Sequence, residues 1–168
     1  SGASPARTAP DPMTPHSEPS APLGRALVAR VFLPFAAGFF LSYAFRVVNA
    51  VIGPEIAGEV GLTAEDLGLL PSVYFITFAA FQVPLGVLLD RYGPRRVEAV
   101  LLLIAALGAG LFAASSTLGG LAFARGLIGL GVSACLMAGF KAFVVWFPAA
   151  RLPLANGALV ACGGAGAL

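Results

Sequence analysis

The sequence of 168 residues has few charged side chains, only two cysteines and a single histidine. Charged residues make up 11% of the chain and hydrophobic residues 58%, whereas about a quarter of the residues in soluble domains are charged. The formal net charge of +2 is too small to indicate a nucleic-acid partner. Two cysteines exclude a disulfide scaffold and a cysteine-rich metal site, and we expect no metal or cofactor. These deficits exclude a soluble domain and predict an all-α membrane protein with several spans.

The first 24 residues differ from the rest, because they hold six of the thirteen prolines and show no apolar period. This composition predicts a disordered tail over residues 1–24. It is not a secretory signal, because the apolar region comes later and is too long. Met13 is a candidate native start, and His16 is expected to be a solvated residue of the tail.

The remaining residues, 25–168, contain apolar stretches long enough to cross a bilayer, which takes about 20 residues. Spans are predicted at 28–52, 64–89, 97–115 and 118–145, and a fifth starts near residue 154. The pair Gly53-Pro54 predicts the end of the first span. Thr63 and Asp66 resemble a capping box, which places the start of the second span near Ala64. The last residue lies within an apolar run, so we expect residues 25–168 to be an incomplete amino-terminal helical bundle of a longer polypeptide.

Positive residues near the span ends predict the orientation. The loops after the first and third spans carry no Lys or Arg, whereas the opposite side carries seven. These seven are Arg25, Arg30, Arg91, Arg95, Arg96, Lys141 and Arg151. We therefore expect a multi-pass protein of the inner (plasma) membrane with a cytoplasmic amino terminus.

One polar cluster lies within the first span. Tyr43, Arg46 and Asn49 are spaced by three residues, which places them on one helix face. An Arg within a span is costly unless it faces a polar cavity or finds an anion, and its planar fork suits a carboxylate or phosphate. The alternative is that Arg46 extends to the lipid headgroups. The neighbouring Tyr43 and Asn49 favour the cavity, since a snorkelling Arg needs no hydrogen-bonding companions.

A second intramembrane cation, Arg125, lies in the fourth span beside Gly126 and Gly129. These glycines allow close helix approach and leave room for the long side chain. Two roles stay open for Arg125: substrate handling or coupling, and a structural role with bonds to backbone carbonyls. Gln82, in the second span, is expected to make a packing hydrogen bond.

The third polar cluster is the loop between the second and third spans. Asp90 ends a helix, where the helix dipole disfavours a carboxylate. We expect compensation from Arg91, from Arg95 or from the amino-terminal end of another helix. Gly86 lies one turn before Asp90 and would clear a surface for that helix, and Gly93 supplies a sharp turn.

This loop resembles the signature loop between helices two and three of the major facilitator superfamily. The matching residues are Gly86, Leu88, Asp90, Arg91, Gly93 and Arg95, with Arg96 following. Arg125-Gly126 with Gly129 is similar to the Arg-bearing motif of helix four. The resemblance implies a secondary transporter of twelve helices in two halves that works by alternating access. The chain would then hold helices one to four and part of five of a six-helix half, and would need the missing carboxy-terminal half. The loop would act as a cytoplasmic gate against that half.

The pattern from Tyr43 to Asn49 is also similar to that of the anion:cation symporters and, more loosely, to organophosphate and nitrate porters. This resemblance implies a small anionic organic solute, bound by Tyr43, Arg46, Asn49 and Arg125. Symporters of that group often have an Asp at the position of Phe45. We find no Asp or Glu deep in any span, so a proton carrier would come from the missing half. Otherwise the mechanism is exchange, uniport or sodium coupling.

Other functions remain as alternatives. A membrane enzyme would need a nucleophile, metal ligands or paired acids, and the spans offer no His and no paired carboxylates. We therefore do not expect an enzyme. The rival hypotheses are a non-transporting sensor or scaffold on the same fold, and a transporter of a neutral or cationic solute.

Overall fold

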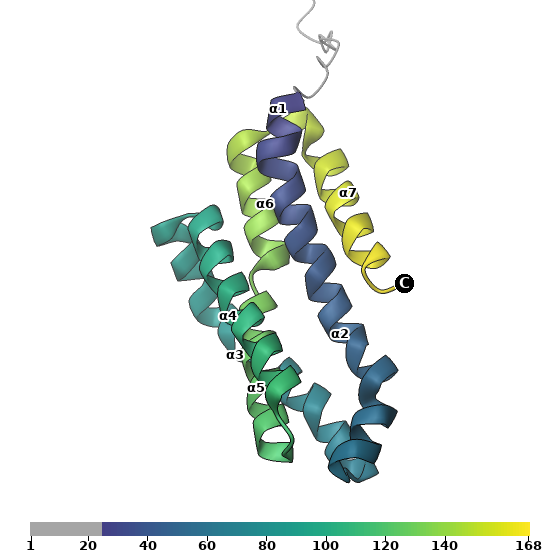
Figure 1. The fold of residues 1–168 in the computed structure, drawn as a ribbon. Helices are drawn as coiled ribbons and strands as arrows, with labels where there is room; N and C mark the ends of the chain where they lie inside the picture. The colour runs from purple at the N-terminus through teal and green to yellow at the C-terminus, as the bar shows by residue number, and fades with distance from the viewer. Residues whose placement is uncertain (1–24) are drawn as a thin grey trace, which may run out of the picture.

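The structure, a computed structural model, describes residues 25–168 (Figure 1). No strand occurs among these residues, which confirms the expected all-α fold class. The predicted tail, residues 1–24 with Met13 and His16, lies outside the described residues. The elements in chain order are α1 (Arg25–Leu27), a π-helical segment (Val28–Phe32), α2 (Leu33–Val60), α3 (Ala64–Tyr92), α4 (Pro94–Ala114), α5 (Leu118–Val132), α6 (Cys135–Trp146), a 3-10 turn (Ala149–Arg151) and α7 (Leu152–Ala165).

Four helical segments of the described chain are long and apolar enough to cross a membrane. They correspond to the four predicted complete spans. Helix α7, with 14 residues, begins close to the predicted start of the fifth span. The four segments are Val28–Val48, Ala64–Tyr92, Pro94–Ala114 and Leu118–Trp146.

The predicted end of the first span is wrong. Helix α2 continues through Gly53 and Pro54 as far as Val60. A proline removes one backbone donor, and here that loss does not stop the helix. The helix ends at Gly61, whose φ of 74° is the left-handed conformation in which glycine is favoured. The connection to α3 is therefore much shorter than the loop that the sequence predicted.

The start of α3 agrees with its prediction. The Asp66 amide donates to Thr63 Oγ1 at 3.2 Å, and the Thr63 amide donates to Asp66 Oδ2 at 2.9 Å. This reciprocal pair is the capping box that the sequence indicated. It satisfies two donors at the helix start that would otherwise lack partners.

The predicted fourth span is divided into two helices. Helix α5 ends at Val132 and α6 begins at Cys135, with Ser133 and Ala134 between them. Gln82 of α3 donates through Nε2 to the Ser133 carbonyl at 3.2 Å. This bond confirms the packing role expected for Gln82, and it satisfies a carbonyl that lies where the helix is interrupted.

The helices form two groups on either side of this interruption (Figure 1). Helix α5 packs between α3 and α4, and α2 packs against α6 and α7. Two glycines of α5 permit its close contacts: a Cβ on Gly129 would collide with the Tyr74 carbonyl of α3, and one on Gly131 with the Leu101 carbonyl of α4. These positions explain why α5 lies so close to both neighbours.

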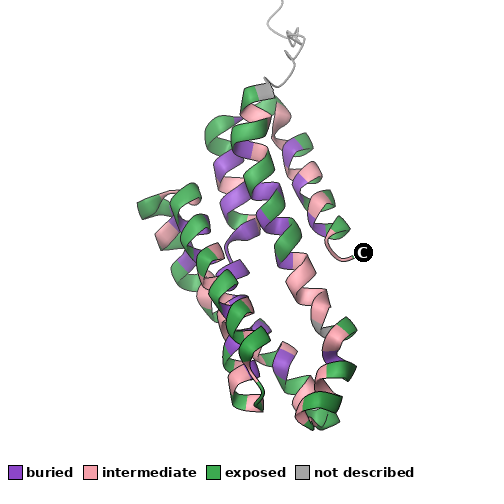
Figure 2. Cartoon of the chain, viewed as in Figure 1, coloured by how far each residue is buried: buried purple, intermediate pink, exposed green. Residues whose placement is uncertain are grey.

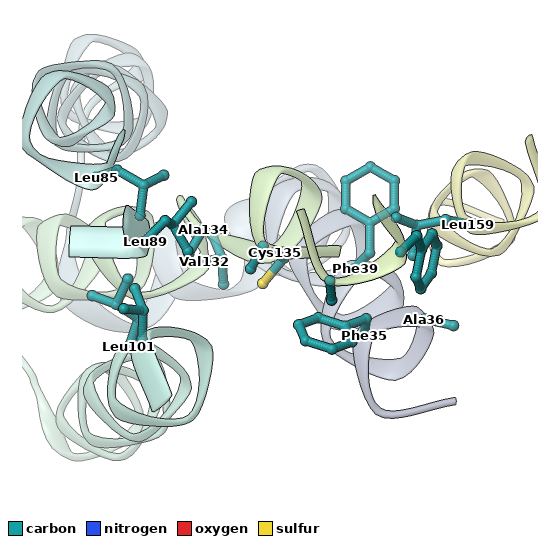
Figure 3. Close-up of a cluster of buried hydrophobic side chains, with 14 of the residues drawn as sticks. Phe35, Ala36, Phe39, Leu85, Leu89, Leu101, Val132, Ala134, Cys135 and Leu159 are labelled. Atoms are coloured by element: carbon teal, nitrogen blue, oxygen red, sulfur yellow. The ribbon is translucent and has the colours of Figure 1, made fainter. Parts of the chain in front are cut away.

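Buried residues lie mainly on the inner faces of both groups, and exposed residues lie mainly on the outer faces (Figure 2). Figure 3 shows Leu85, Leu89 and Leu101 on one side of the core and Phe35 and Leu159 on the other. Ala134 and Cys135 lie between the two sides, at the start of α6. The interruption of the fourth span therefore sits at the centre of the core and joins the two groups of helices.

Candidate functional site

Arg46 of α2 lies against three aromatic rings. Its Cζ atom is 4.9 Å from the centroid of the Tyr43 ring, one turn earlier on the same helix. The corresponding distances are 5.5 Å to Phe75 and 5.6 Å to Phe78, both on α3. A guanidinium over aromatic faces is attracted by their negative quadrupole. Within residues 25–168 Arg46 has no ion-pair partner, so these rings stabilise the cation without neutralising its charge.

Arg46 also lines a pocket of about 370 Å³ between α2 and α3. The Nε atom of Arg46 is buried and has no hydrogen-bond partner. A donor in this state carries a desolvation cost that a bound acceptor would relieve. The other residues that line the pocket are Ala50, Gly53, Pro54, Leu67 and Pro71.

Tyr43 and Asn49 are the two residues predicted to share a helix face with Arg46. Tyr43 is half-buried and packs edge-on against Phe39, with ring centroids 5.1 Å apart. Its ring also faces Arg46, as the helical spacing predicted. Asn49 lies in α2, but its side chain is outside the described part of the structure.

Arg125 of α5 is almost completely buried, with 2% of its surface exposed. Its Nη1 atom donates to the Phe45 carbonyl of α2 at 3.1 Å. Its Cζ atom lies 4.4 Å from the centroid of the Phe112 ring on α4. Arg125 therefore reaches the backbone of α2 directly beside Arg46, and the two arginines converge on one stretch of that helix.

Sequence reasoning missed Tyr74 of α3. This side chain is 2% exposed, and its hydroxyl donates to the Ser42 carbonyl at 3.5 Å. It also lies close to both Arg46 and Arg125. A tyrosine in the middle of an apolar span was the available signal, because a buried phenol normally finds a polar partner. Its partners lie on other helices, which periodicity within one span does not reveal.

The signature loop positions Asp90 at the end of α3. Asp90 Oδ1 forms an ion pair with Lys141 Nζ of α6. The prediction that Arg91, Arg95 or a helix amino terminus would compensate Asp90 is therefore corrected, because α6 brings a lysine to the carboxylate. In the sequence, Lys141 indicates only the orientation of the spans.

A groove of about 500 Å³ runs beside this ion pair, between α3 and α6. Gly86 is exposed and lines it, and a Cβ at Gly86 would meet no atom within 4 Å. The residues that line the groove are Gln82, Leu85, Gly86, Leu89, Asp90, Met137, Phe140, Lys141 and Val144.

The other residues of the loop make different contacts. Gly93 has a φ of 80°, which makes the sharp turn from α3 to α4. The guanidinium of Arg91 lies 5.5 Å from the ring centroid of its neighbour Tyr92. Arg95 and Arg96 are exposed on the first turn of α4, and each lines a different pocket. The cationic residues thus spread around the helix ends and do not converge on Asp90.

An acidic residue near the start of the predicted third span, which the sequence analysis did not single out, is buried in the protein. Glu98 lies in the second turn of α4 and is 5% exposed. The opposing helix α2 covers it, which is a tertiary effect.

Comparison with known proteins shows which family this sequence matches. Residues 35–168 match the family model described as the Major Facilitator Superfamily. The chain is 33% identical over 119 residues to a probable sulfoacetate transporter of Cupriavidus necator, covering 71% of this chain and 28% of that protein. It is 30% identical over 120 residues to a hexuronate transporter of Escherichia coli, covering 71% and 28%.

A third relative is a nitrate/nitrite transporter of Picosynechococcus, which is 30% identical over 119 residues, covering 71% of this chain and 22% of that protein. The chain therefore spans about a quarter of the length of the curated relatives that it matches.

Proposed function

This chain belongs to the Major Facilitator Superfamily, and on that premise we propose that it is part of a secondary transporter that moves a small anionic organic solute by alternating access. The three relatives described above carry names that refer to sulfoacetate, hexuronate and nitrate or nitrite transport. All of these are anions, which supports the proposed charge of the solute. The second half of such a transporter would complete the cavity from the remainder of the polypeptide.

The environment of Arg46 carries this proposal. Its guanidinium packs against three rings without an ion-pair partner among residues 25–168, and its Nε donor lacks a partner beside a pocket. A carboxylate or sulfonate would supply the missing acceptor and the missing negative charge together. We propose that Arg46 and Tyr43 contact the solute, with Asn49 on the same predicted helix face.

For Arg125 we propose a positioning role next to the solute site. Its burial and its bond to the Phe45 carbonyl support the structural alternative over direct solute contact. By fixing the backbone of α2 beside Arg46, the Arg125 side chain would hold the solute-binding guanidinium in place. We therefore expect substitutions of Arg125 to reduce solute affinity less than substitutions of Arg46.

We propose that the signature loop faces the cytoplasm and forms a gate with the second half of the transporter. The seven positive residues on one side of the spans support this orientation. The exposed Gly86 beside the groove between α3 and α6 leaves space for a helix of the second half. The gate residues would be Gly86, Asp90, Arg91, Gly93, Arg95 and Arg96.

The direct test is uptake by proteoliposomes that contain the full-length protein. Radiolabelled hexuronate, sulfoacetate and nitrate are the anionic probes, and a neutral hexose is the comparison. We expect uptake of at least one anion by the wild type and a loss of about tenfold or more in kcat/KM for Arg46→Gln, since a charge-assisted hydrogen bond contributes about 1.5–3 kcal/mol. Arg30→Gln, which removes an exposed arginine near the start of the first span, is the matched control.

Uptake of the hexose without uptake of any anion would favour a transporter of neutral solutes. Binding of an anion without uptake would favour a sensor. Equal anion uptake by the wild type and the Arg46→Gln variant would reject the proposed site while leaving the family assignment intact.

A further inference from the structure

Glu98 of α4 is a buried acidic side chain that the proposed solute site does not use. It is 5% exposed, and its Oε1 atom is buried without a hydrogen-bond partner. Within residues 25–168 no ion pair includes Glu98. A buried polar group without a partner is rare enough in folded proteins to require an explanation.

The space for this carboxyl group comes from a glycine on the facing helix. A Cβ built on Gly38 of α2 would collide with Glu98 Oε1 and would also touch the Leu102 side chain. Helices α2 and α4 otherwise pack mainly on other partners, α2 on α7 and α4 on α5. The pair Gly38–Glu98 is therefore a specific point of contact between two helices that share little other packing.

A pocket of about 230 Å³ lies beside the carboxyl group. Arg95, one turn earlier on α4, is exposed and lines the same pocket, so the pocket reaches the outer surface. The remaining lining is apolar and comes from Pro34, Phe35, Ala99 and Leu102.

Few charged or titratable groups face Glu98. From its own helix, Arg95 lines the pocket, and from α6 the buried thiol of Cys135 lies nearby. The residues of α2 that line the pocket or face the carboxyl group, which are Pro34, Phe35 and Gly38, carry no charge. With no cation paired to it, an ionised carboxylate at this place would be strongly disfavoured, and the group takes up a proton instead.

We propose that Glu98 is a proton-binding site whose occupancy is linked to the contact between α2 and α4, and that the proton is the ion coupled to solute movement. The second part rests on the proposed transport function. With α2 against α4, the carboxylate takes a proton from hydronium in the pocket, which forms the O–H bond and leaves water. When the contact loosens, water solvates the carboxylate, and the proton returns to water as hydronium.

The chemistry of the pocket favours a proton over a metal cation. Hard cations such as sodium bind to several oxygen ligands at once. Here one carboxyl group faces an apolar lining, and the nearby Arg95 is itself a cation. A proton needs only one oxygen atom of Glu98. The site therefore favours the proton over sodium, the two coupling ions that the sequence left open.

The first test needs no solute. Infrared difference spectroscopy of the purified full-length protein, titrated from mildly acidic to mildly alkaline pH, detects the carbonyl stretch of a protonated carboxyl group. We expect a band at neutral pH that shifts in deuterated water and is absent in Glu98→Gln, a variant of nearly the same shape. Glu65→Gln, which alters an exposed acidic residue at the start of α3, is expected to keep the band. An identical spectrum for the wild type and Glu98→Gln would overturn the proton site.

A second variant tests the link to the contact between the two helices. Gly38→Ala should displace the carboxyl group toward the pocket, where water stabilises its charge, and should reduce the protonated band at neutral pH. Gly58→Ala is the matched control on the same helix, because a Cβ at Gly58 meets no atom within 4 Å. An unchanged band in Gly38→Ala would reject the linkage.

The coupling is tested with proteoliposomes that take up hexuronate or sulfoacetate. An inward proton gradient should stimulate uptake by the wild type and by Glu65→Gln, and Glu98→Gln should lose this stimulation. Stimulation that persists in Glu98→Gln would overturn the coupling role. Failure of the wild type to take up any tested anion would overturn the transport function and the coupling with it, whereas the infrared titration would still decide the proton site.

Discussion

The Nη1 atom of Arg125 on α5 donates a hydrogen bond of 3.1 Å to the main-chain carbonyl of Phe45 on α2. The same guanidinium lies over the ring of Phe112 on α4. One buried side chain thus joins three helices at the level of Arg46. A carboxylate often occupies the position of Phe45 in the symporters that this sequence resembles, and here the arginine bonds to the backbone at that position.

Replacing Arg125 with Lys should destabilise the helical bundle. The compact ammonium of lysine cannot bond to the Phe45 carbonyl and cover the Phe112 ring in the same way as the planar guanidinium. We expect a loss of about 1.5–3 kcal/mol, the range for a hydrogen bond with a charged group. The thermal midpoint of the detergent-solubilised full-length protein would measure it, with Arg30→Lys as the exposed control. Equal midpoints for the two variants would contradict the positioning role.

Replacing Gly131 with Ala should separate α5 from α4. The added methyl group would collide with the backbone of Leu101 and Ala105. Because backbone atoms cannot move aside as a flexible side chain can, we expect a destabilisation of about 1–3 kcal/mol, typical of overpacking. A lower thermal midpoint would report it.

Gly110→Ala is the matched control for this experiment. Gly110 is an exposed residue of α4, and a Cβ there meets no atom within 4 Å. Alanine should stabilise this position by about 0.5–1 kcal/mol through its higher helix propensity. A similar loss of stability in both variants would argue against close packing as the cause.

Breaking the ion pair between Asp90 and Lys141 should change stability only slightly. The Asp90 side chain is 78% exposed in this pair, so water screens the attraction. We expect Lys141→Met to cost about 0.2–1 kcal/mol, the usual range for exposed ion pairs. A double-mutant cycle with Asp90→Asn isolates the pairwise energy. A coupling well above this range would indicate that the pair is more shielded in the complete protein.

Removing the cap of α3 should weaken the amino-terminal end of that helix. Thr63→Val takes away the oxygen that accepts from the Asp66 amide. The expected cost is about 1 kcal/mol, as for other lost amino-terminal caps. Faster hydrogen exchange confined to the first turn of α3 would identify the cause, and an unchanged exchange pattern would refute it.

The sequence was sufficient to predict the spans whose limits depend on local chemistry. The capping box at Thr63 and the glycine turn at Gly93 both lie where expected, because each is formed by residues close together in the chain. The end of the first span was misjudged, because Gly53-Pro54 removes only one backbone donor and a helix can continue past it. The interruption itself, at Ser133 and Ala134, contains no glycine or proline, and the nearby Gly131 already has a packing role against α4. The Ser133 carbonyl accepts a hydrogen bond from Gln82 on another helix.

For the candidate site, periodicity placed Tyr43 beside Arg46, because both lie on one helix. It did not reveal Phe75, Phe78 or Tyr74, since their contacts with Arg46 arise from the packing of α3 on α2. Sequence reasoning also overlooked the burial of Glu98, which depends on Gly38 in a distant part of the chain. Contacts between helices are therefore what the sequence alone left unspecified.

The continuation of α2 through Pro54 has an electrostatic consequence at the carboxy-terminal end of that helix. A helix of 28 residues is about 42 Å long, while the hydrocarbon layer measures about 30 Å. The excess turns carry Glu55 and Glu59, both exposed. In the proposed orientation these turns project into the external water and add negative charge there. In the transporter proposed above, these carboxylates would repel an approaching anion before it reached Arg46, and added salt would screen this repulsion.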